Sequence, residues 1–75
     1  MSYLSFIYEK TSPSGLTQRW GIRAGNGELL GIVSWYAPWR KYTAQLLITS
    51  VFDAGCFREV ADFLDKVNAE HKNGR

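Results

Sequence analysis

The feature of this sequence that most restricts its fold is a short stretch, residues 31–42, in which aromatic and basic side chains surround a proline. The stretch reads GIVSWYAPWRKY and holds two of the three tryptophans and two of the four tyrosines of the 75-residue chain. Pro38 cannot donate a backbone hydrogen bond and disfavours helix at Ala37, so a β-ladder must stop there. We therefore expect a corner between two strands.

The two strands that flank this corner differ in pattern. The run from Leu29 to Trp35 or Tyr36 is mostly apolar, which favours a central strand covered on at least one face. Residues 40–48 instead alternate between two faces, as in a half-buried strand. One of these faces carries Tyr42, Ala44, Leu46 and Ile48.

Two further strands are expected in the N-terminal part of the chain. Residues 3–9 are rich in aromatic and β-branched side chains, and the turn-forming cluster 11–15 follows them. Residues 17–23 alternate so that Trp20 and Ile22 share one face, which we expect to be the core face. Gly25-Asn26-Gly27 then supplies the residues that a tight hairpin needs.

The last element is an amphipathic helix that starts at Asp53. This carboxylate can cap the first turn, and Phe52 and Phe57 occupy the two positions of a hydrophobic staple. Spacings of three and four predict one apolar stripe that packs on a sheet. The stripe consists of Phe57, Val60, Leu64 and Val67, widened by Cys56, Ala61 and Phe63.

Together these elements predict an α+β domain, residues 1–75, in which a small antiparallel sheet of about four strands (ββββα) is covered by one C-terminal helix. Residues 70–75 are polar and are expected to fray around His71. A chain of this length buries only about 60% of its surface. The core must therefore consist of large side chains, and 15% of the residues are aromatic.

Charge and cysteine content restrict the biological setting. The net charge is +2, and basic side chains at Arg19, Arg23, Arg40 and Lys41 fall in the sheet region while acidic ones gather in the last third. This charge is far from the strong basicity of a dedicated nucleic-acid binder. The single Cys56 cannot form an internal disulfide, and no apolar run is long enough to span a bilayer. We expect a cytoplasmic protein that does not enter a membrane.

No pattern of catalytic groups, metal ligands or cofactor-binding residues is recognisable, so neither an enzyme nor a cofactor is predicted. Cys56 lies at the edge of the apolar stripe without a histidine base nearby, which favours a buried, inert thiol. Glu70 and His71 are adjacent on a helix and point apart, and a metal site needs three or four ligands, so His71 is interpreted as a surface residue. Asp62 and Asp65 lie three apart on the helix and are interpreted as a pair of solvated carboxylates.

The aromatic and basic side chains around Pro38 are the candidate binding residues. Aromatic rings in so small a domain are mostly core, but exposed ones beside an arginine are typical of protein-binding hot spots. The same side chains can also stack on bases and contact phosphates. The candidate residues for binding protein or nucleic acid are Tyr36, Trp39, Arg40, Lys41, Arg19 and Arg23.

The second half of the chain resembles a family of short, uncharacterised proteins encoded by bacteriophages and prophages. The similarity lies in the WYxPWRKY stretch, in VFDxxC at residues 51–56 and in ADFL at residues 61–64; the family strand after Tyr42 is more aromatic than this one. The resemblance implies a phage accessory protein in the host cytoplasm. We expect it to bind and modulate or inhibit a host or anti-phage protein complex, for example a CRISPR effector. Weak nucleic-acid binding is the alternative, and a homodimer is compatible with either.

Overall fold

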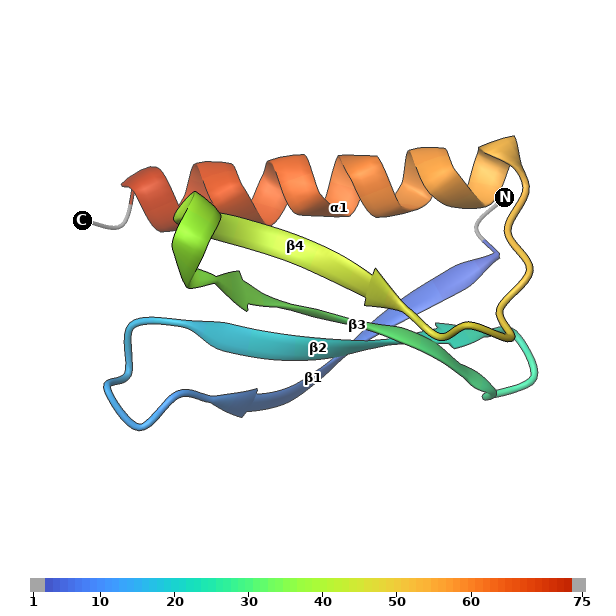
Figure 1. Cartoon of the computed structure of the whole chain (residues 1–75), viewed down its shortest axis with the longest axis horizontal. Helices are drawn as coiled ribbons and strands as arrows, with labels where there is room; N and C mark the ends of the chain where they lie inside the picture. Colours follow the sequence, from blue (N-terminus) through green and yellow to red (C-terminus); the bar gives the residue numbers. More distant parts are fainter. Residues whose placement is uncertain (1–2, 74–75) are drawn as a thin grey trace.

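Four antiparallel strands in sequence order form one sheet, and a single helix lies across one of its faces (Figure 1). The computed structural model describes residues 3–73. The elements are β1 (Leu4–Thr11), β2 (Gln18–Ala24), β3 (Leu29–Tyr36), the short 3-10 helix η1 (Ala37–Trp39), β4 (Lys41–Leu46) and α1 (Ala54–Asn73). This arrangement confirms the predicted ββββα fold.

Strand register brings the apolar positions of all four strands onto the face that α1 covers. Phe6 pairs with Ile22, Ile22 with Gly31, and Gly31 with Leu46. Ile22 and Val33 are completely buried, as expected for the two central strands. Gly31 permits a close approach of β4, because a Cβ atom here would lie 2.6 Å from the carbonyl oxygen of Gln45.

Aromatic rings fill the space between the sheet and the helix. Phe63 of α1 stacks on Phe6 with ring centroids 4.1 Å apart, and Trp20 meets Phe63 edge to face at 5.2 Å. Val60 and Val67 are buried on either side of this cluster. The predicted stripe is therefore displaced toward Phe63, whereas Phe57 is 54% exposed and was wrongly assigned to the core.

The start of α1 has both the helix cap and the hydrophobic staple that the sequence predicts. The Cys56 N–H donates to Asp53 Oδ1 at 2.9 Å, and this hydrogen bond lowers the pKa of the Asp53 carboxyl. The rings of Phe52 and Phe57 lie 5.5 Å apart, which is the predicted hydrophobic staple. Phe57 therefore contributes to the entry of the chain into the helix.

The C-terminal end of α1 differs from the prediction of a frayed tail. The helix continues through His71 to Asn73, and residues 74 and 75 lie outside the described range. His71 is half-buried, with its ring 4.5 Å from that of Trp35 and 5.7 Å from that of Tyr42. These ring contacts hold the last turn against the sheet, so the interpretation of His71 as a surface residue was wrong.

The predicted fourth strand, residues 40–48, was one residue too long at its start and two residues too long at its end. β4 ends at Leu46. The Leu47 N–H still donates to the Leu30 carbonyl, in register with the β3–β4 ladder, but the Leu47 carbonyl accepts a hydrogen bond from the Ser50 N–H, both at 2.9 Å. The chain thus turns at residues 47–50, and Ile48 projects from the turn instead of extending the core face.

The acidic side chains of α1 differ in their surroundings. Glu59 accepts hydrogen bonds from the backbone N–H groups of Tyr3 and Leu4 at 3.1 and 3.2 Å, which fixes the start of β1 to the helix. Asp62 and Asp65 remain exposed. Within residues 3–73, no helix combines the length and the apolar character needed to cross a membrane.

Candidate functional site

The corner between β3 and β4 is a tight, hydrogen-bonded turn. Pro38 lies in the first turn of η1, where its missing N–H costs nothing. The Arg40 N–H donates to the carbonyls of Tyr36 and Ala37 at 2.9 and 3.1 Å. Arg40 has φ 55°, the single left-handed conformation among the non-glycine residues in the described range. Such conformations are uncommon for residues with a Cβ atom; Arg40 adopts one as the C-cap of η1, a position where helices often end in this way.

This turn presents two aromatic rings and a guanidinium group to solvent. Trp39 is 64% exposed and Tyr36 is 39% exposed, and their rings meet edge to face at 5.1 Å. Arg40 is exposed beside them and forms no ion pair within residues 3–73. Lys41 pairs with Tyr36 across the ladder and is also exposed. We refer to Tyr36, Trp39 and Arg40 as the corner surface.

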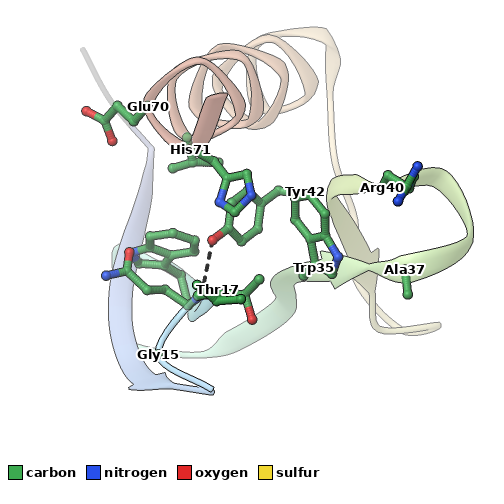
Figure 2. A pocket seen from close by; sticks show the side chains of 12 residues that line it. Gly15, Thr17, Trp35, Ala37, Arg40, Tyr42, Glu70 and His71 are labelled. Atoms are coloured by element: carbon green, nitrogen blue, oxygen red, sulfur yellow. Dashed lines mark hydrogen bonds between the residues drawn. The ribbon is translucent and has the colours of Figure 1, made fainter. Parts of the chain in front are cut away.

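A pocket of about 620 Å³ adjoins the corner surface, between η1, the loop from β1 to β2 and the end of α1. Its wall is aromatic, formed by Trp20, Trp35, Tyr42 and His71. Figure 2 shows His71 extending from α1 toward Tyr42, with Glu70 directed outward. The Tyr42 hydroxyl is fixed because it accepts a hydrogen bond from the Gln18 N–H at 3.1 Å. We call this hollow the aromatic pocket.

The six predicted binding residues divide into two groups. Tyr36, Trp39, Arg40 and Lys41 gather at the corner, and Arg40 also lines the aromatic pocket. Arg19 and Arg23 lie on β2, on the sheet face that α1 does not cover, because they alternate with Trp20 and Ile22.

Both of these arginines are engaged within the fold. The Arg19 Nε atom pairs with Glu9 at 3.1 Å, and Arg23 Nη1 donates to the Gly27 carbonyl at 2.8 Å. The structure therefore does not unite the four basic residues into one free cationic surface.

The thiol at the start of α1 has the electrostatics of an unreactive group. A hydrogen bond with the Asp53 backbone lowers the pKa of Cys56, but desolvation, the Asp53 side chain and the charge of Glu59 outweigh it and raise the pKa overall. Among residues 3–73, no three His, Cys, Asp or Glu side chains are grouped so as to hold a metal ion.

Sequence reasoning missed His71 as a wall of the aromatic pocket. The signal was present, because His71 follows Val60, Leu64 and Val67 at the same spacings of four, three and four. Its position near the C-terminus, among polar residues, indicated a frayed tail instead. No comparable pattern in the sequence predicts the hydrogen bond from the Gln18 N–H to the Tyr42 hydroxyl.

Comparisons of the chain with models of known protein families, with curated proteins and with solved structures each gave no match. The similarity to phage proteins over residues 31–64 stays a prediction from those residues.

Proposed function

We propose that this protein is a non-enzymatic binding protein and that its corner surface is the contact site for a protein partner. The observation that carries the proposal is the exposure of Trp39 beside Tyr36 and Arg40. Tryptophan, tyrosine and arginine are the residues most enriched at binding hot spots. A domain this small gains core stability by burying its large rings, so an exposed tryptophan on a rigid turn has another role.

The rigidity of the corner favours tight binding. Pro38 restricts the backbone, the Arg40 N–H is shared by two carbonyls, and the edge-to-face contact orients the rings of Tyr36 and Trp39. The residues of the corner are therefore already ordered before a partner binds, which reduces the entropic cost of association. The complementary partner surface has an apolar hollow for Trp39 and a carboxylate that pairs with Arg40.

The aromatic pocket extends this contact site. Arg40 lies at its border, so a partner that covers the corner surface can also insert an apolar or aromatic side chain into the pocket, against the rings of Trp35 and His71. Such a buried anchor next to an arginine is the usual centre of a small protein interface.

A protein partner is favoured over nucleic acid by the state of the arginines. On β2, Arg19 pairs with Glu9 and Arg23 donates to the Gly27 carbonyl, so Arg40 and Lys41 are the two cations at the corner. Two phosphate contacts give only weak and salt-sensitive binding.

The biological role that we propose follows from the resemblance to phage and prophage proteins. The partner is a host or anti-phage protein complex in the bacterial cytoplasm, for example a CRISPR effector, which this protein modulates or inhibits.

The proposal is tested by affinity capture from bacterial lysate, with and without nuclease. The tagged protein should retain a protein partner in both samples, and the variant Trp39→Ala/Arg40→Ala should lose it. A matched control is Tyr8→Ala/Lys10→Ala, which removes an exposed ring and an exposed cation from β1. Loss of the partner after nuclease treatment would instead indicate nucleic-acid binding.

A further inference from the structure

The turn after β4 exposes an unusual amount of apolar surface. Ile48 is 101% exposed and Val51 is 90% exposed, with Leu47 partly exposed next to them. The turn is nevertheless ordered by three hydrogen bonds, since Leu47 N–H and Ser50 Oγ both donate to the Leu30 carbonyl and Ser50 N–H donates to the Leu47 carbonyl. We call Leu47, Ile48 and Val51 the apolar turn.

A hollow of about 360 Å³ lies directly beside the apolar turn. Thr49, Ser50 and Val51 form one of its sides, and Leu29, Leu30 and Cys56 contribute further lining. We call it the end pocket. Both features lie at the end of the molecule where β4 leads into α1, opposite the end that carries η1 (Figure 1).

We infer that a second copy of this chain covers the apolar turn, with Ile48 of each copy inserted into the end pocket of the other. A protruding side chain and a hollow that share the same loop can be paired by one two-fold axis, so each copy gives and receives the same contact. The contact then closes as a dimer, because no unused turn or pocket remains for a third copy.

The charge distribution favours self-association at this end. Residues 46–52, LLITSVF, carry no charged side chain, so two copies of the turn meet without repulsion. Glu28 is the one charged residue among the described residues that line the end pocket, and it is exposed. The corner surface, in contrast, carries Arg40 next to Lys41 and would repel its own copy.

The size of the apolar turn sets the expected strength of the dimer. Its side chains expose on the order of several hundred Å² of apolar surface, which is at the upper end for a patch on a monomer. Burial of this area on two copies gives roughly 1,000 Å², the lower limit for a specific interface. We therefore expect a dimer that dissociates on dilution.

Dimerisation through this end leaves both corner surfaces free at the two distal ends. The assembly is then bivalent for any partner of the corner surface, which raises the effective affinity for a partner that is itself repeated. The dimer does not depend on the identity of that partner.

Sedimentation velocity over about 1 µM to about 1 mM protein tests the inference. The wild-type protein should shift from monomer to dimer within this range, and Ile48→Asp should remain monomeric with an unchanged circular dichroism spectrum. Leu16→Asp is the matched control, because Leu16 is 72% exposed and belongs to the loop between β1 and β2, which lies at the other end of the molecule (Figure 1). A wild-type monomer throughout, or an Ile48→Asp variant that still dimerises, would overturn the proposal.

A disulfide test examines the contact itself. Cys56 lines the end pocket, so Ile48→Cys should form an intermolecular disulfide with Cys56 of the second copy when oxidised glutathione removes the two thiol hydrogens. The covalent dimer should be lost in Ile48→Cys/Cys56→Ser and absent in Leu16→Cys. Equal cross-linking in the Leu16→Cys variant would show that the contact is unspecific and would contradict the proposal.

Discussion

Asn68 on α1 and Tyr42 on β4 exchange two hydrogen bonds. The Tyr42 N–H donates to Asn68 Oδ1 at 2.7 Å, and Asn68 Nδ2 donates to the Tyr42 carbonyl at 3.3 Å. β4 is an edge strand, and a further strand would otherwise use these two backbone groups. The helix therefore covers the sheet and also closes this edge against strand addition.

Replacement of Asn68 by leucine is expected to lower the free energy of unfolding by about 1 to 3 kcal/mol, because it leaves two partly buried backbone groups of Tyr42 without partners. Urea unfolding followed by circular dichroism measures this loss. Asp65→Leu, at an exposed position of the same helix, should change stability by less than about 0.5 kcal/mol. Equal stabilities of the two variants would show that the Asn68 contacts contribute nothing.

The three helix side chains that were assigned to one stripe should differ in their contributions. Phe63→Ala removes the ring stacked on Phe6 and should cost about 3 to 5 kcal/mol, and Leu64→Ala, which is half-buried, about 2 kcal/mol. Phe57→Ala should cost less than about 1 kcal/mol, since this ring contacts Phe52 near the surface. Chemical denaturation of the three variants measures the loss in the free energy of unfolding for each. If Phe57→Ala caused the largest loss, this packing would be contradicted.

Two buried glycines should respond differently to the addition of a methyl group. The Cβ atom of Gly31→Ala would meet the Gln45 carbonyl at 2.6 Å and the Leu46 Cα atom at 3.1 Å, both in the backbone of β4. That of Gly21→Ala would meet the flexible end of Glu9, which can move away. Gly31→Ala should therefore cost about 1 to 3 kcal/mol and Gly21→Ala markedly less. Thermal unfolding of both variants is the measurement, and the reverse order would refute the close approach of β3 and β4.

Acidification should weaken the start of α1 through Asp53. The pKa of this carboxyl is lowered in the folded state from its ordinary 3.8, so its ionisation stabilises the fold above that value. This stabilisation is lost as the pH falls from about 3.8 through the lower folded-state value. Asparagine caps a helix without titrating, so Asp53→Asn should lose less stability than the wild type over this range. Parallel losses in both proteins would exclude the contribution of Asp53.

The fold was predictable because its signals are local. The alternation of Trp20 and Ile22, the Gly25–Gly27 turn and the Asp53 cap each depend on neighbours in the sequence, and each is present in the structure. The end of β4 was not predictable in this way. It is set by Ser50, whose N–H donates to the Leu47 carbonyl and whose hydroxyl donates to the Leu30 carbonyl. The alternating pattern continues to Ile48 and does not predict these hydrogen bonds.

The candidate site was only partly predictable, for a similar reason. The exposure of Trp39 follows from a turn at Pro38 that cannot bury all the rings around it. The engagement of Arg19 and Arg23 depends on the partners Glu9 and Gly27, which the alternation along β2 does not predict. His71 joins the aromatic pocket because Trp35 and Tyr42 lie opposite it in the fold.

The most direct test of the binding role is the affinity of the captured partner for Trp39→Ala/Arg40→Ala, measured on the same preparation as its circular dichroism spectrum. Loss of a hot spot of more than about 2 kcal/mol predicts a dissociation constant raised at least about 30-fold with the fold intact. The Tyr8→Ala/Lys10→Ala control should bind like the wild type. A folded double variant with unchanged affinity would place the contact elsewhere, and one that unfolds would show that the corner belongs to the core; either result would contradict the proposed role of the corner surface.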